Sequence, residues 1–252
     1  MTITTTEPPQ SSVSLSAVEP VFQPAPEDDA VTRAWWMHLA WVIAAAAMGF
    51  VIPAVFVSGL HVSRAVFVLP YVVLTAAFLY RYVRWSGVDV YARLRKNWVW
   101  GVIGAIVAGA FVVSNVFNQP TSAAPGGIEL VGAILWLGVV YGTTDALLLS
   151  ILPLFATWQA LAGVGWTRRW YGRIGSGVLA LTASLIVAAT YHLGFPEYRN
   201  AGVMAPVVGN GVMSLASLLT MSPIAAIGAH IAMHVAAVLH GAETTLQLPP
   251  HY

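Results

Sequence analysis

The run Asn97–Phe117, NWVWGVIGAIVAGAFVVSNVF, decides the fold class, because it carries no charged side chain over a length that matches a bilayer core. About 20 apolar residues in a helix cross that core. Seven such runs predict an all-α fold, a polytopic helical membrane bundle of about seven transmembrane helices. They are Ala34–Val57, Arg64–Val83, Asn97–Phe117, Leu130–Leu152, Ile174–Leu193, Gly202–Met221 and Ile224–His240. Apolar character continues from Pro153 to Trp166, which leaves room for the fourth span to run on as a kinked or interfacial segment.

The composition of the whole chain agrees with a membrane bundle and excludes other classes. Of its 252 residues, 58% are hydrophobic and 8% are charged, whereas about a quarter of an average soluble domain is charged. Such values argue against a soluble globular enzyme and against a disordered protein. The net charge of +1 gives no basic field for nucleic acid. Without cysteine, the chain has no disulfide, zinc-thiolate site or Fe–S cluster.

Three parts of unequal size follow from the distribution of apolar residues. Residues 1–33 are rich in Thr, Ser, Pro and Glu, and we predict a disordered polar tail there. No short apolar region follows a basic start, so this tail does not resemble a secretory signal. Residues 34–241 form the predicted transmembrane bundle, and residues 242–252 form a short C-terminal tail.

Two links between spans are basic, which predicts the orientation in the cell membrane. Basic links face the cytoplasm, and those between the second and third spans and before the fifth span carry Arg81, Arg84, Arg93, Arg95, Lys96, Arg168, Arg169 and Arg173. The link Asn118–Gly127 has no Lys or Arg and should face outward. An odd number of spans then places the N-terminus in the cytoplasm and the C-terminus outside.

Seven spans also invite comparison with rhodopsins, but the sequence argues against that class. The only lysine is Lys96, in a basic link, whereas a retinal Schiff base needs a lysine inside the last span. No internal repeat of the transporter kind is visible either.

Asp145 is the acidic side chain closest to the middle of a span, in Val139–Leu149, VVYGTTDALLL. An ionisable group in hydrocarbon costs at least about 2.5 kcal/mol on insertion scales, so it indicates a functional site by default. The alternative is structural, because a protonated or hydrogen-bonded Asp145 can tie two helices together.

Histidines provide the second signal. His192 ends the fifth span, and His230 and His234 lie four residues apart on one face of the seventh, with Cβ atoms about 6 Å apart. That spacing suits two ligands of one metal ion or two groups near one oxyanion, and equally two packed imidazoles. His192 lies about 12 Å along the axis from the centre of its span, so either that span is shifted or tilted, or His192 lies outside the cluster. The remaining histidines are expected to be solvated: His38, His61, His240 and His251.

Around these residues the chain resembles the CPBP family, the CAAX-protease and bacteriocin-processing (Abi) intramembrane proteases. That family carries Glu-Glu-x-x-x-Arg on one span, Phe-x-x-x-His on the next and His-x-x-x-Asn on the last. The counterparts here, in the same order, are Thr144–Asp145, Ala188–His192 and His230–His234. The resemblance covers roughly residues 131–241, and the first three spans are generic.

The resemblance implies an intramembrane peptidase that cleaves a membrane-borne peptide or protein. Asp145 and His192, with Thr144 at the first glutamate position, would form the catalytic group that activates water. His230 and His234 would hold a divalent metal such as zinc or stabilise the oxyanion. Asp145, His192, His230 and His234 together would make an Asp/His₃ metal site.

The motifs also depart from the family pattern. The arginine position holds Leu149 or Ser150, the phenylalanine is Ala188 and the asparagine is His234. Thr144 cannot act as a general base at neutral pH, and a carboxylate displaced by about 1 Å can lose roughly a hundredfold in rate. Two further hypotheses therefore stand beside the peptidase. One is a catalytically degenerate relative that binds a partner, lipid or peptide, and the other is a membrane protein with a histidine-ligated metal or cofactor.

Overall fold

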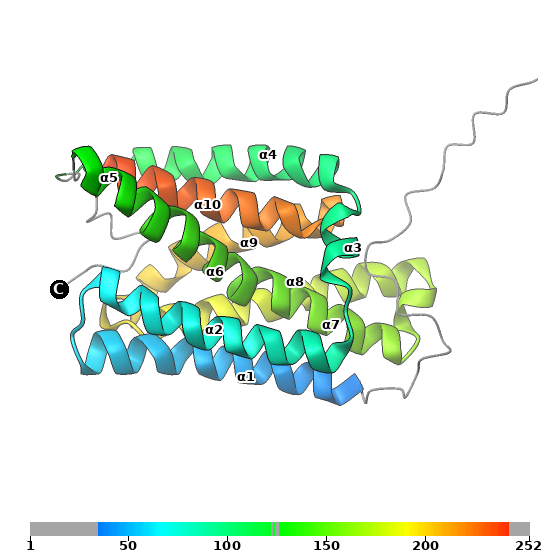
Figure 1. The fold of residues 1–252 in the computed structure, drawn as a ribbon. Coiled ribbons are helices and arrows are strands. Elements are labelled where there is room, and N and C mark those ends of the chain that lie inside the picture. The colour runs from blue at the N-terminus through cyan, green and yellow to red at the C-terminus, as the bar shows by residue number, and fades with distance from the viewer. Residues whose placement is uncertain (1–34, 122, 124–125, 242–252) are drawn as a thin grey trace, which may run out of the picture.

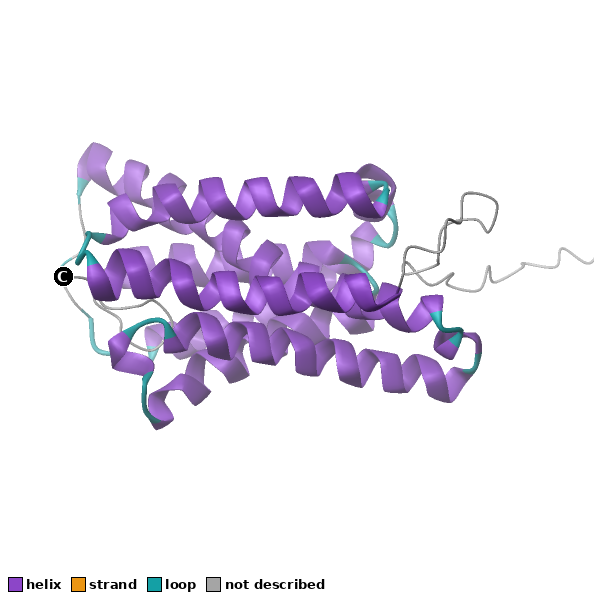
Figure 2. Ribbon diagram, turned by 90° about the horizontal axis from the view of Figure 1, so that it is seen from below, coloured by secondary structure: helices purple, strands orange, loops and turns teal. Residues whose placement is uncertain are grey.

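The all-α class is confirmed by a computed structural model, which describes residues 35–121, 123 and 126–241. Within these ranges 88% of the residues are helical and none is in a strand (Figure 2). The predicted tails, residues 1–33 and 242–252, lie outside the described residues.

Seven helical segments are long and apolar enough to cross a membrane, as the sequence predicted. They are Trp35–Gly59, Arg64–Ser86, Trp98–Phe117, Gly127–Gly163, Trp170–Leu193, Ala201–Thr220 and Pro223–His240. The chain is therefore a multi-pass membrane protein whose outer faces contact lipid. Large apolar side chains point outward from these faces, among them Ile43, Val73 and Ile106, each at least half exposed.

The individual elements follow one another as an antiparallel bundle (Figure 1). Labels with η mark π-helical or 3₁₀ turns. In chain order the elements are α1 (Trp35–Pro53), η2 (Ala54–Gly59), α2 (Arg64–Ser86), α3 (Val90–Arg95), α4 (Trp98–Phe117), α5 (Gly127–Ala133), η3 (Ile134–Val140), α6 (Tyr141–Asp145), η4 (Ala146–Ile151), α7 (Leu152–Gly163), η5 (Trp166–Arg168), α8 (Trp170–Leu193), η6 (Pro196–Tyr198), η7 (Ala201–Val203), α9 (Met204–Thr220) and α10 (Pro223–His240).

The fourth span is one continuous helix from α5 to α7, and it crosses the bundle diagonally (Figure 1). Its 37 residues give a length of about 55 Å, well beyond the roughly 30 Å of a bilayer core. Its first half packs on α10 and its last part packs on α1 and α8. The helix runs on past Pro153, as its apolar continuation suggested. Just before the proline, the hydroxyl of Ser184 on α8 donates to the carbonyl of Leu149 in η4 at 2.7 Å.

Helix α10 lies at the centre of the bundle, between α4, α6 and α9. Small residues allow this close packing. A Cβ on Gly142 of α6 would lie 3.0 Å from the carbonyl oxygen of His230, and one on Gly228 would lie 2.7 Å from Ala105 of α4. The backbones of α6 and α10 therefore approach closely at the level of His230, which brings Asp145 near the histidines of α10.

Candidate functional site

Asp145 is the last residue of α6, between the π-helical segments η3 and η4, and its side chain is buried. Wide π-helical turns change which side chains face the core and are frequent at functional sites. Tyr71 of α2 donates its hydroxyl hydrogen to Asp145 Oδ1 at 2.7 Å. Asp145 Oδ2 lies 3.0 Å from Nε2 of His234 on α10. Both carboxylate oxygens therefore have partners, and these come from two other helices.

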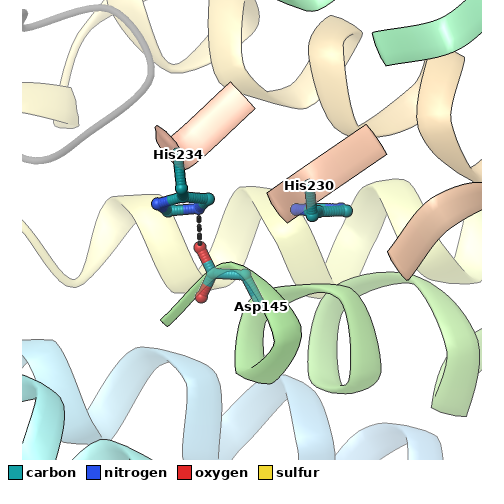
Figure 3. A group of neighbouring side chains, drawn as sticks. All are labelled: Asp145, His230 and His234. Atoms are coloured by element: carbon teal, nitrogen blue, oxygen red, sulfur yellow. Dashed lines mark hydrogen bonds and ion pairs between the residues drawn. The ribbon is translucent and has the colours of Figure 1, made fainter. Parts of the chain in front are cut away.

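His230 and His234 lie one turn apart on the same face of α10, as their spacing predicted, and both are buried. Their rings are nearly parallel, with centroids 6.5 Å apart and an interplanar angle of 20°. Figure 3 shows the carboxylate of Asp145 reaching toward His234, with His230 beside it on α10. Ligand atoms of these three residues all lie within 4.8 Å of one another. The structure therefore brings together three of the predicted site residues from two spans.

The start of α10 shows why these histidines are held in place. Pro223 occupies the first turn, where a missing N–H removes no helical hydrogen bond. The backbone N–H of Ala226, in the first turn, donates to Ser217 Oγ of α9 at 2.9 Å. The α9–α10 hairpin is thus fixed at its turn, and the orientation of α10 follows.

His192 lies in the last turn of α8, where its ring is also buried. Its Nδ1 is 2.7 Å from the carbonyl oxygen of Ala188. A carbonyl only accepts, so Nδ1 donates and the neutral imidazole carries its lone pair on Nε2. The ring of Tyr198 packs edge-on against His192 with centroids 5.2 Å apart. Burial raises the pKa of the Tyr198 hydroxyl, which keeps this neighbour neutral.

The end of α8 is anchored to the first span. Ser58 donates its hydroxyl hydrogen to the carbonyl of Gly194 at 2.7 Å. A Cβ on Gly194 would lie 2.5 Å from Cγ of Pro53, so only glycine permits this approach. The anchor sets the depth at which His192 lies.

A small cavity of about 20 Å³ lies between α6, α8, α9 and α10. Three predicted site residues line it, Asp145, His192 and His230, together with Asn210, Met213 and Met233. His192 therefore does face the cluster, although it lies in the last turn of α8 whereas His230 and His234 lie near the middle of α10. A cavity of this size takes one water molecule or one bare ion.

Thr144 is buried beside Asp145, but its hydroxyl donates to the carbonyl of Val140 at 2.8 Å in the same helix. It is not among the residues that line the cavity. No contact described for Thr144 supports the catalytic role expected from its motif position. His38, expected to be solvated, is instead buried, with Nδ1 3.2 Å from the hydroxyl of Tyr82. Its ring packs among aromatic side chains of α1 and α2, which exclude water from it.

Three buried tyrosines next to Asp145 were missed by the sequence reasoning. Tyr71 bonds the carboxylate, and the hydroxyls of Tyr141 and Tyr191 lie 2.6 Å apart. A signal was present, because Tyr141 precedes Asp145 by one helical turn and Tyr191 directly precedes His192. For Tyr71, which follows Pro70 in the second span, no comparable signal exists.

Four further polar residues were also missed: Ser150, Ser184, Asn210 and Ser214. They form a buried hydrogen-bonded group on η4, α8 and α9, which we name the serine–asparagine network. Ser150 Oγ lies 3.2 Å from Nε2 of His230, so the network touches the site directly.

The donor set fits a divalent metal ion such as zinc. One carboxylate oxygen and two imidazole nitrogens resemble common catalytic zinc sites. Two atoms at about 2 Å from a tetrahedral zinc lie about 3.3 Å apart, and Asp145 Oδ2 and His234 Nε2 are 3.0 Å apart. Nδ1 of His230 is buried without a hydrogen-bond partner among the described residues. Buried polar atoms of this kind call for a ligand, an ion or a water.

No protein-family model, no curated protein and no solved structure matches the chain. The resemblance to the CPBP family therefore rests on the three motifs alone and stays a prediction.

Proposed function

We propose that the protein is an intramembrane peptidase of the CPBP type, which activates a water molecule beside Asp145 and His192 to cleave a membrane-borne peptide. The observation that carries this proposal is the cavity, which is lined by Asp145, His192 and His230 and has room for one water. Groups from three separate spans converge there, and a general base must lie within hydrogen-bond reach of the water that it activates.

His192 is the general base in this proposal. Its Nδ1–H is held by the Ala188 carbonyl, so Nε2 presents the lone pair that takes a proton from water. The ring cannot rotate freely, because the edge contact with Tyr198 and the bond to Ala188 fix it. The proton on Nε2 then passes to the leaving amine, as a general base returns it in acyl hydrolysis.

Asp145 supplies the negative charge that stabilises a protonated His192. The two residues line the same small cavity, and the bonds from Tyr71 and His234 hold the carboxylate in one orientation. A fixed charge in a site without bulk water acts more strongly than the same charge in solution.

Asp145, His230 and His234 would hold the metal ion, on the evidence of their donor atoms and of the unpaired Nδ1 of His230. Bound there, a divalent ion would polarise the scissile carbonyl and the attacking water.

The test replaces Asp145 by asparagine, which keeps the size of the side chain and removes its charge. Wild-type protein in liposomes should cleave members of a library of fluorogenic transmembrane peptides, and Asp145→Asn should lose at least about a hundredfold in rate while remaining folded. Glu129→Gln, on the exposed start of the same helix, is the matched control and should be silent. If the carboxylate only ties helices together, Asp145→Asn is close to silent too. A wild type that cleaves no membrane peptide supports instead a degenerate relative that binds a partner, lipid or peptide.

A second candidate, metal carriage, is favoured by Met213 and Met233, whose side chains line the cavity together with His230. Thioether and imidazole groups are ligands for copper as well as zinc. The metal content of the purified protein, measured by mass spectrometry, decides between ions. For one shared ion, His230→Ala and His234→Ala each abolish binding, and the double variant is hardly worse than either.

The orientation belongs to the same proposal, with α3 and the α7–α8 link on the cytoplasmic side of the cell membrane, the N-terminus in the cytoplasm and the C-terminus outside. The alternation of the spans puts both basic links at one end of the bundle (Figure 1), as the positive-inside rule requires. Cysteine at the exposed Thr121 should react with a membrane-impermeant reagent in intact cells, and cysteine at the exposed Ala92 should not. The reverse labelling would invert the orientation.

A further inference from the structure

The serine–asparagine network has an internal direction that its hydrogen bonds fix. Ser184 donates its hydroxyl hydrogen to the carbonyl of Leu149 at 2.7 Å, and a carbonyl only accepts. Ser184 must therefore accept from its neighbour Asn210, whose Nδ2 lies 2.9 Å away. The amide nitrogen of Asn210 thus faces Ser184, and its oxygen Oδ1 faces Ser150.

Ser150 carries the next step of the chain. Its single hydroxyl hydrogen goes to Asn210 Oδ1 at 2.9 Å. Ser214 lies 2.8 Å from both Ser150 Oγ and Ser184 Oγ and has one hydrogen to give to either, so at least one lone pair of Ser150 Oγ stays free. Toward Nε2 of His230, at 3.2 Å, Ser150 can then act only as an acceptor.

His230 is thereby left with one arrangement of its protons. Nε2 carries hydrogen and donates to Ser150, so the neutral ring has its lone pair on Nδ1. That Nδ1 is fully buried and has no partner among the described residues. All four members of the network are themselves buried and bonded to one another, so the unpaired nitrogen of His230 stands out in an otherwise satisfied cluster.

We propose that Ser150 and Asn210 are positioning residues that hold His230 in its Nε2–H form, with the Nδ1 lone pair free to accept a metal ion. A nitrogen in this form cannot donate to an oxyanion, so the network selects the metal-ligand role of His230 over the oxyanion role. This use of Nδ1 rests on the proposed function, whereas the proton arrangement does not.

The proton arrangement is measured directly by ¹⁵N NMR of histidine-labelled protein in nanodiscs at neutral pH, without added metal. Comparison with His230→Gln identifies the two signals of His230. We expect a protonated Nε2 and a lone-pair Nδ1 in the wild type. Observation of Nδ1–H, or of an equal mixture of both forms, overturns the proposal without the need for any further variant.

Variants then test whether the network is the cause. Ser150→Ala removes the acceptor and should populate the Nδ1–H form, whereas Ser150→Thr keeps the hydroxyl and should restore the wild-type spectrum. Ser176→Ala is the matched control, because Ser176 is a buried serine of α8 that is not part of the network. An unchanged spectrum in folded Ser150→Ala contradicts the proposal.

Metal affinity provides a second measurement that separates the two proposals. Titration with zinc alone should show a loss of about 10- to 100-fold for Ser150→Ala, as is usual when the hydrogen-bond partner of a ligating histidine is removed. If wild-type His230 has the expected protons but binds no zinc and the protein cleaves no peptide, the proposed function fails and the positioning of His230 stands. If zinc binds with unchanged affinity to Ser150→Ala, the positioning role fails and the proposed function stands.

Discussion

The fourth and seventh spans of this bundle are more deeply buried among other helices than the first and second spans. In the most apolar stretch of the fourth span, Gly127–Gly163, 50% of the residues are buried, and the same holds for the seventh, Pro223–His240. In the first two spans, Trp35–Gly59 and Arg64–Ser86, the share is 28%. Asp145, His230 and His234 lie on the two well-covered spans, where protein rather than lipid surrounds a polar group.

The residues of the candidate site thus lie on spans that other helices cover on more than one side. A polar group in lipid finds no partner, whereas a group between helices can be bonded on several sides. The outer spans, the first and second, contribute many lipid-facing apolar side chains, but buried groups too, among them His38 of α1 and Tyr71, which reaches inward from α2 to Asp145. Substitutions should therefore lower the free energy of unfolding most at positions buried between helices and least at positions that face lipid.

The largest effect is expected where α6 and α10 touch through their backbones. Gly142→Val would place side-chain atoms against the backbone of His230 and Ile231, which lies 3.0 Å from the position of a Cβ and cannot move aside. We expect a loss of about 3 kcal/mol in the free energy of unfolding. Unfolding in mixed micelles with increasing SDS measures it.

Gly132→Val is the matched control on the same long helix, because a Cβ at Gly132 meets nothing within 4 Å. It should leave the unfolding curve nearly unchanged. Equal losses for the two variants would mean that the close contact of α6 with α10 does not hold the bundle together.

A moderate effect is expected at Tyr71, an inward-facing residue of an outer span. Tyr71→Phe keeps the ring that stacks on Phe67 and removes the hydrogen bond to the Asp145 carboxylate. We expect a loss of about 1–2 kcal/mol in the free energy of unfolding. Tyr80→Phe, on the exposed face of the same helix, should change it by less than about 0.3 kcal/mol. A silent Tyr71→Phe would show that α2 is independent of the site.

The smallest effect is expected on the lipid-facing side of α4. Ile106→Ala removes a side chain that is 65% exposed, and should cost less than about 0.5 kcal/mol. Val112→Ala on the buried face of the same helix should cost about 1 kcal/mol through lost packing contacts. Thermal unfolding in detergent compares the pair, and a larger loss for Ile106→Ala would place a protein partner, rather than lipid, on that face.

Much of the fold follows from the sequence, because the bilayer fixes the length of each apolar run. The span Arg64–Ser86 begins at the predicted residue, and Trp98–Phe117 ends at it. The start of the fifth span was placed at Ile174, four residues late, because the aromatic and basic residues from Trp170 are not apolar although they are helical. The wide turns of η3 and η4 also escaped prediction, since π-helical hydrogen bonding leaves no periodic signal in so short a stretch.

The site could be predicted only where a charged or titratable side chain stands out against an apolar background. Asp145, His230 and His234 meet that condition, and the structure brings them together. Serine and asparagine do not stand out, because such residues are common in membrane helices as local hydrogen-bond formers. Which of them face the cavity depends on the tilt of the fourth span and on the depth of α8. Both are set by packing between helices, so neither can be predicted from the sequence of one helix.

The bond from Ser184 to the Leu149 carbonyl has a consequence for how this sequence can change over evolutionary time. The carbonyl takes the single hydroxyl hydrogen of Ser184, so Ser184 accepts from the amide of Asn210. A residue without a hydroxyl at position 184 would remove this acceptor and free the Asn210 amide to turn. Positions 184 and 210 should therefore vary together among descendants of this chain. A change in α8 would then alter the proton pattern around His230 without touching a residue of the site.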